Sequence, residues 1–149
     1  MPHPLVLALA VIIAPLAAPR PAVTTPTSPT EAVIVNSGST NTAGYVLRVS
    51  ADGNGTLRQD GDEHRVQVSR ALADRFFADL RAAGPLDALP HTFCMKSASF
   101  GTTTTVAYRG KRSPDLNCPS GSAGTALVQD ARAIAAAAGV TVRRRPLVR

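Results

Sequence analysis

Short runs of β-branched and alternating apolar residues occupy the chain between residues 32 and 68, and they predict four β-strands. The runs lie at residues 32–35 (AVIV), 45–50 (YVLRVS), 56–59 (TLRQ) and 64–68 (HRVQV). Residues 52–55 (DGNG) and 60–63 (DGDE) separate the last three, and both sequences favour the tight turns of β-hairpins. Val66 and Val68 alternate with polar neighbours, as expected of a half-buried strand.

The pattern then changes to helical spacing. Ser69 is able to cap the free amides at a helix start. One face of the following helix is apolar because three large residues recur every fourth position, at Leu72, Phe76 and Leu80. Gly84-Pro85 ends this helix, since glycine permits a left-handed backbone and proline prevents continuation.

The remaining segments give a second alternation of strand and helix. We expect a Thr-rich strand over residues 98–108, a turn over 109–112, a short return strand or coil over 113–118, a helix over 123–138 that Gly139 stops, and a short strand over 140–142. The order ββββ-α-β(β)-α predicts an α+β fold in one domain, residues 32–142. Its antiparallel sheet of about four to six strands carries two helices packed on one face.

The other face of such a sheet meets solvent. Candidates for a polar and mildly basic surface there are Arg48, Arg58, Thr103 and Thr105. The side that each residue takes depends on register, because a slip of one residue exchanges the two faces.

The N-terminus predicts export. Residues 5–16 (LVLALAVIIAPL) are 12 residues without a charge, too few to span a bilayer but typical of the apolar centre of a signal peptide. A buried N-terminal helix is the alternative, which the surrounding prolines disfavour. We therefore expect residues 1–18 to be a signal peptide, the protein to be secreted or periplasmic, and no stable membrane span to remain after its removal.

Two further segments flank the predicted domain. Residues 19–31 form a Pro/Thr-rich linker and residues 143–149 a basic tail. The net charge of +6 comes from 16 basic and 10 acidic residues, yet four of the arginines lie in the tail, so the rest of the chain is nearly neutral at 12 − 10 = +2. A nearly neutral body without interleaved aromatic residues does not indicate a nucleic-acid partner.

Cys94 and Cys118 are the only cysteines. In an exported protein an even number of cysteines favours a disulfide, here with 23 residues between its ends. Two free thiols are one alternative. A redox pair is another, but it lacks Cys-x-x-Cys spacing.

Residues able to carry chemistry are few and scattered. His3, His64 and His91 match no zinc pattern, and the glycines form neither a phosphate-binding loop nor a dinucleotide fingerprint. Residues 52–56 (DGNGT) faintly suggest a calcium loop, but a hairpin turn explains them more simply. We predict no catalytic residue, metal or cofactor. A small secreted hydrolase with His64 or His91 as its base stays open as an alternative.

The order of elements, together with Gly84-Pro85-Leu86 and Leu89-Pro90 after the first helix, resembles emfourin, a family of small inhibitors of the metalloprotease protealysin. The resemblance spans about residues 33–139. The chain departs from that family by its export signal, its cysteine pair and its Asp-Gly-Asn-Gly turn. The resemblance implies protease inhibition through an exposed segment near residues 36–44.

The sequence thus predicts an exported, non-catalytic binding module whose partner is a protein or a component of the cell envelope. The alternatives are a metalloprotease inhibitor and the small hydrolase. The residues expected in the interaction loops are Asn36, Ser37, Thr40, Asn41, Arg109, Lys111 and Arg112.

Overall fold

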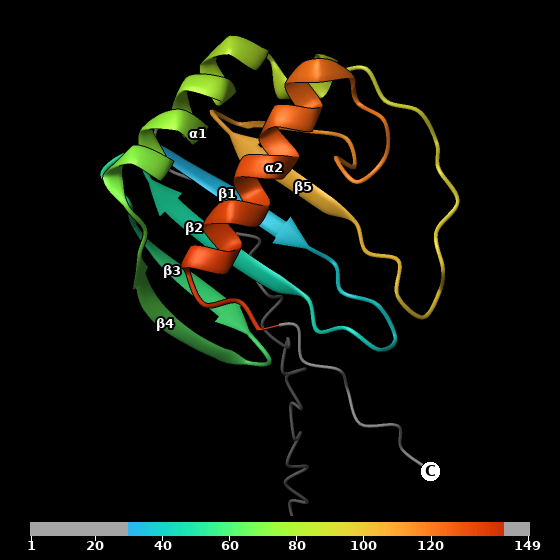
Figure 1. Cartoon of the computed structure of the whole chain (residues 1–149), viewed down its shortest axis with the longest axis horizontal. Coiled ribbons are helices and arrows are strands. Elements are labelled where there is room, and N and C mark those ends of the chain that lie inside the picture. The colour runs from blue at the N-terminus through green and yellow to red at the C-terminus, as the bar shows by residue number, and fades with distance from the viewer. Residues whose placement is uncertain (1–29, 142–149) are drawn as a thin grey trace, which may run out of the picture.

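An antiparallel sheet covered by two helices is the main feature of the computed structural model, which describes residues 30–141 (Figure 1). The strands lie in the order β4-β3-β2-β1-β5-β6. Their bounds are β1 Glu31–Asn36, β2 Tyr45–Ser50, β3 Asn54–Gln59, β4 Asp62–Gln67, β5 Thr104–Tyr108 and β6 Lys111–Arg112. The helices are α1 Arg70–Ala83, the short 3-10 helix η1 Leu86–Ala88, and α2 Gly121–Ala137. The predicted α+β fold with its antiparallel sheet is confirmed.

The register of the strands decides which residues face the helices. Ile34 on the central strand β1 pairs with Leu47 of β2 and with Val106 of β5, and Leu47 pairs in turn with Leu57 of β3. Directly paired residues share a face of the sheet. These four side chains are almost completely buried, so this row forms the floor of the core.

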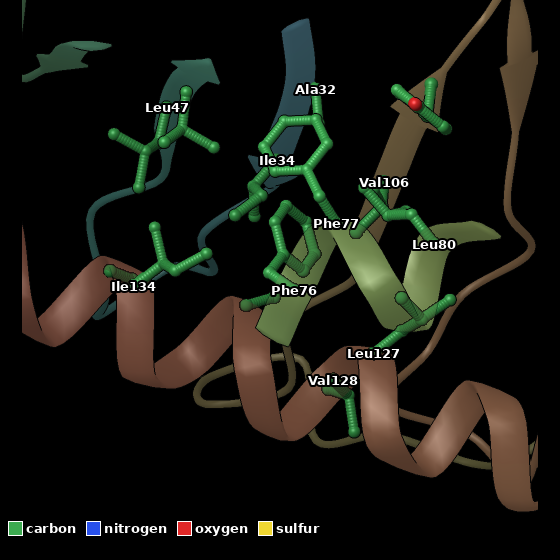
Figure 2. Close-up of a cluster of buried hydrophobic side chains, with 14 of the residues drawn as sticks. Ala32, Ile34, Leu47, Phe76, Phe77, Leu80, Val106, Leu127, Val128 and Ile134 are labelled. Carbon is green, nitrogen blue, oxygen red and sulfur yellow. The ribbon is translucent and has the colours of Figure 1, made fainter. Parts of the chain in front are cut away.

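The helices cover that floor from one side. Phe76, Phe77 and Leu80 of α1 and Leu127 and Ile134 of α2 are almost completely buried against it. Figure 2 shows the two phenylalanine rings between the strands and helix α2. The predicted apolar face of α1 is therefore the face that packs on the sheet.

Local capping fixes the ends of α1 as predicted. The Ser69 side chain accepts a hydrogen bond from the Leu72 N–H at 3.3 Å. At the other end the Gly84 N–H donates to the Arg81 carbonyl, and Gly84 has a φ of 70° that favours glycine.

Two predicted boundaries in the second half of the chain are wrong. The strand expected over residues 98–108 begins only at Thr104. A turn precedes it, in which the Gly101 N–H donates a hydrogen bond to the Ser97 carbonyl. The turn expected over 109–112 is shorter, since Lys111 and Arg112 form β6. Arg109 and Gly110 alone make the connection, with φ values of 49° and 74°, as a two-residue mirror-image turn requires.

The end of the described chain differs as well. The sequence predicts Val140 and Thr141 in a short strand, but in the structure neither residue lies in one. Instead, the Gln59 side chain donates to the Thr141 carbonyl at 2.8 Å and accepts from its N–H at 3.2 Å. A side chain thus satisfies the groups that a strand partner would have used.

Several sequence predictions fall on residues outside the described range. They are the signal peptide at residues 1–18, the linker up to residue 29, Val142 and the basic tail at 143–149. Glu31, predicted as linker, is the first residue of β1. Within residues 30–141 no helix is both long enough and apolar enough to cross a membrane.

Asp130 is a buried charge between the two helices. Its side chain lies on α2, only 4% exposed, and one oxygen accepts from Arg75 Nε of α1 at 2.6 Å. The other oxygen, Oδ2, is buried without a hydrogen-bond partner. Burial raises the pKa of Asp130; Asp79 acts in the same direction, whereas Arg75 opposes it.

This geometry predicts an unusual pH dependence. A pKa that is higher in the folded than in the unfolded chain means that the native state binds the proton more tightly. Protonation of the Asp130 carboxyl group therefore raises the free energy of unfolding as the pH falls through its pKa in the folded protein. This increase is complete below the pKa of the carboxyl group in the unfolded chain, which is near 3.9. We expect Asp130→Asn, which mimics the protonated acid, to be more stable than the parent at pH 7 and to lose that advantage near pH 4. Urea titrations at both pH values measure this, and an equal difference at both would contradict it.

Candidate functional site

Three large apolar side chains are exposed in the loop that connects η1 to β5. Phe93 is 87% exposed, Met95 92% and Phe100 63%. Figure 1 shows this loop, drawn in yellow, arching away from the helices and the sheet. Single exposed apolar residues are common, but three large ones within eight residues of one loop make this loop a candidate interaction site.

The part of this loop at residues 92–97, which we call the tethered segment, is held to the domain by alternate side chains. Cys94 forms the predicted disulfide with Cys118, which follows β6, with the two Cα atoms 5.5 Å apart. Phe93 and Met95, on either side of Cys94, are the two most exposed large apolar residues of the described chain.

Lys96 continues this alternation as the second anchor. Its Nζ donates to the Thr102 carbonyl at 2.9 Å and forms an ion pair with the Asp115 carboxylate. Burial lowers the pKa of Lys96. The side chains of residues 94 and 96 therefore face the domain, while those of 93 and 95 face solvent.

The main-chain hydrogen bonds of the tethered segment lie only at its two ends. The Thr92 N–H donates to the Pro119 carbonyl at 3.1 Å, but among the residues that the structure describes, no main-chain hydrogen bond involves positions 93–96. No helix, strand or turn includes residues 90–97. These N–H and C=O groups are open to pairing, as they are at the edge of a sheet.

The predicted interaction loop at residues 36–44 supports the lower part of the same loop. Asn41 N–H and Ser39 Oγ donate to the Ser99 carbonyl at 3.1 and 2.8 Å, and Thr40 Oγ1 donates to the Ala98 carbonyl at 3.2 Å. Ser37 N–H donates to the Thr103 carbonyl at 2.9 Å. The predicted residues Ser37, Thr40 and Asn41 therefore lie beside the exposed apolar loop.

Two asparagines complete this support from inside. Asn36, also a predicted contact residue, donates through Nδ2 to Thr104 Oγ1 at 3.0 Å. Asn117 donates to the same oxygen at 3.0 Å and to the Thr102 carbonyl at 2.9 Å. The hydrogen bonds of Asn36 fix the base of the loop, which gives that residue a structural role here.

The other predicted contact residues lie elsewhere. Arg109, Lys111 and Arg112 belong to the β5–β6 hairpin, whereas the apolar loop enters β5 at its opposite end. Lys111 Nζ contacts Asp87 Oδ2 at 2.7 Å, and the hydrogen bond lowers the pKa of Asp87. The Arg109 guanidinium lies over the Tyr108 ring, 5.1 Å from its centre. The structure thus does not bring the two predicted groups together.

The helix-free face of the sheet carries three of the four predicted residues, with Val33, Val35 and Val46 among them, whereas Thr103 precedes β5. Register places Arg48, Arg58 and Thr105 on the face opposite Ile34, and Arg48 forms an ion pair with Glu31 at 3.1 Å. A shallow depression of about 580 Å³ on this face has a lining of both charge signs, which includes Glu31, Arg48, Glu63 and Arg65. Ion pairing within the lining leaves it without a strong field of one sign.

The two histidines that a hydrolase would need lie at separate, exposed positions of the domain. His64 is exposed on β4 and His91 is exposed in the loop after η1. Neither lines the depression on the helix-free face or the one bordered by Asn36, Tyr45 and Arg58. Within residues 30–141 no group of three or more His, Cys, Asp or Glu side chains is placed to hold a metal ion.

The carboxylate of the suggested calcium loop closes the β2–β3 hairpin instead. Asp52 accepts from the Asn54 N–H at 3.1 Å and from its side chain at 2.8 Å, and from the Ser50 hydroxyl. The Ser50 and Asn54 hydrogen bonds lower the pKa of Asp52 to about 2. The simpler hairpin interpretation accounts for this residue.

Sequence reasoning overlooked Phe93, Met95 and Phe100. A signal was present, because large apolar residues flank Cys94 in a stretch with no strand or helix periodicity. Their exposure depends on contacts of Cys94 and Lys96 with residues about 20 positions away, which the local pattern does not reveal.

Comparison with known proteins finds no relative. No protein-family model matches the sequence, and no curated protein or solved structure matches it either. The resemblance to emfourin therefore stays a prediction, and function is argued from the residues of this chain.

Proposed function

We propose that this protein is an exported, non-catalytic domain that binds another protein through the tethered segment at residues 92–97. One observation carries the proposal: Phe93 and Met95 are almost fully exposed, while the disulfide holds Cys94 between them. An exposed apolar pair on a fixed main chain loses little conformational entropy on binding.

The chemistry of the segment favours a protein partner. Its unpaired main-chain groups at positions 93–96 need hydrogen-bond partners when they leave water. A lipid interior offers no such partners. A protein with a free strand edge offers them, together with pockets for alternate side chains.

The same segment gives little support to a nucleic-acid partner. Its only cation is Lys96, and that ammonium group is already paired with Asp115. Nucleic-acid binding depends on several cations that neutralise phosphates.

Secretion or transfer to the periplasm fits the chemistry of the cysteines. Disulfides persist in oxidising compartments and are rare where thiols are kept reduced. The Cys94–Cys118 bridge is compatible with such a compartment, and the predicted signal peptide supplies a route to it.

A photo-reactive side chain at position 95 tests the proposal. We expect it to cross-link a specific protein of the cell envelope or the medium, with native protein as an effective competitor. The matched control carries the same group at Ala78, an exposed position on α1. Equal labelling from both positions, or none from position 95, would refute protein binding by the segment.

The contribution of each side chain is measured separately. We expect Phe93→Ser and Met95→Ser each to weaken binding by about 30-fold or more, the loss typical of an interface hot spot. Stability should stay unchanged, since both side chains are exposed. Titration of the captured partner by calorimetry measures the affinity, and undiminished affinity in both variants would exclude these side chains from the contact.

A further inference from the structure

The tethered segment offers two features that endopeptidases use to hold their substrates. Such enzymes bind an extended main chain by adding it to a strand edge, and they take alternate side chains into pockets. Residues 93–96 offer unpaired main-chain groups, and the exposed side chains at 93 and 95 are two residues apart, with the anchored Cys94 between them.

From this geometry we infer that the partner is an extracellular serine endopeptidase with an apolar primary pocket, which the protein inhibits by placing Met95 in that pocket. The inference rests on the proposed function and names its partner class. Phe93 then contacts the enzyme two residues before Met95, and the bond presented to the nucleophile is that between Met95 and Lys96.

Met95 fits this position better than its neighbours. Its side chain is 92% exposed, unbranched and apolar, so it is able to enter a deep apolar pocket without rearrangement. Lys96 would suit an enzyme specific for basic residues, but its ammonium group is held by Asp115 and the Thr102 carbonyl. The primary pocket of serine endopeptidases sets their specificity, so an apolar pocket is the one expected.

Anchors on both sides of the Met95–Lys96 bond favour inhibition over digestion. On the N-terminal side the disulfide holds Cys94, and on the C-terminal side the ion pair holds Lys96 while hydrogen bonds hold Ala98 and Ser99. Hydrolysis would add one water, leaving a carboxylate on Met95 and an amine on Lys96. Because both new ends stay attached to the domain, the reverse reaction, which expels that water and reforms the bond, competes with product release.

A metallopeptidase fits the tethered segment less well than a serine endopeptidase does. An inhibitor of such an enzyme benefits from a free metal ligand at its contact site. The Cys94 thiol is consumed in the disulfide, and the tethered segment contains no Asp, Glu or His; the nearest such residue, His91, precedes it. The exposed apolar side chains therefore match a pocket and not a metal ion.

The test is a titration of four endopeptidases with the oxidised, exported protein: chymotrypsin, subtilisin, trypsin and thermolysin. We expect reversible inhibition of chymotrypsin or subtilisin and weaker or no inhibition of trypsin and thermolysin. Met95→Lys should weaken inhibition of the apolar-specific enzyme by at least about 30-fold and create inhibition of trypsin. Prolonged incubation followed by sequencing should find a single slow cleavage, between Met95 and Lys96.

Ala78→Ser is the control, since Ala78 is exposed on α1 and lies outside the apolar loop. It should inhibit as the native protein does. The inference is overturned by rapid digestion without inhibition, by inhibition of thermolysin alone, by no inhibition of any of the four, or by Met95→Lys acting like the native protein.

Failure of this inference is distinguishable from failure of the proposed function. A non-peptidase partner cross-linked from position 95, and confirmed by loss of affinity in Met95→Ser, would leave protein binding intact and exclude the peptidase. Binding to vesicles of phosphatidylcholine and phosphatidylglycerol, lost in Met95→Ser, would overturn both.

Discussion

Replacing Phe77 by alanine is expected to lower the free energy of unfolding by about 3–5 kcal/mol, the range for removing a buried phenylalanine. Phe77 is 2% exposed, and its ring meets those of Phe76 and Tyr108 edge to face, with 5.6 Å between centres in both pairs. Truncation leaves a cavity between α1 and β5 and removes both ring contacts. Equilibrium urea unfolding measures the loss.

Phe77→Leu separates the size of the side chain from the ring contacts. It keeps most of the apolar volume and should cost less than the alanine variant, within about 1–3 kcal/mol, because some repacking strain and the lost ring pairs remain. Equal stability of Phe77→Ala and the parent would mean that α1 does not pack on β5 through this ring.

The parts of the fold that follow local rules were predictable. The alternation around Val66 and the four-residue spacing of Leu72, Phe76 and Leu80 arise from the geometry of strand and helix, so they are visible in a few neighbouring residues. The Ser69 cap and Gly84 stop depend on conformations within one turn of the chain. These predictions are confirmed.

The errors occur where distant residues decide the conformation. A Thr-rich stretch favours a strand, yet Asn36 and Asn117 bind the side chains of Thr102 and Thr104, and Ser99 pairs with residues near position 40. Those partners lie about 15 to 70 positions away in sequence, so tertiary contacts override the local preference. The loop at residues 98–103 results.

The candidate site was predictable only in its covalent anchor. Counting cysteines gives the Cys94–Cys118 pair, but the side chain direction of Met95 follows from the attachment of both Cys94 and Lys96 to the segment around Asp115. The ion pair joins Lys96 to Asp115, which are far apart in the sequence, so no local pattern of residues predicts it. The predicted loop at residues 36–44 lies beside the apolar loop because of similarly distant contacts, its hydrogen bonds to residues 98–103.

Replacing both Cys94 and Cys118 by serine is expected to lower stability and binding by different routes. The bridge closes a loop with a sequence separation of 24. Its removal gives the unfolded chain more conformational freedom, which lowers the free energy of unfolding by about 3–4 kcal/mol in the chain-entropy account. Urea unfolding of the double variant, compared with the oxidised parent, measures the loss. An unchanged midpoint would show that the bridge does not constrain the unfolded chain.

Binding should fall further than stability explains. In the double variant that remains folded, Phe93 and Met95 lose their fixed main chain and must be ordered on contact, which lowers affinity for the partner through added conformational entropy cost. Lys96→Ala is the matched comparison, because it removes the ion pair with Asp115 but keeps the disulfide. We expect a smaller effect from it, since a partly exposed ion pair contributes about 0–1 kcal/mol. Affinity measured at a temperature where both variants are folded distinguishes the two anchors, and a larger loss in Lys96→Ala would assign the tether to the ion pair.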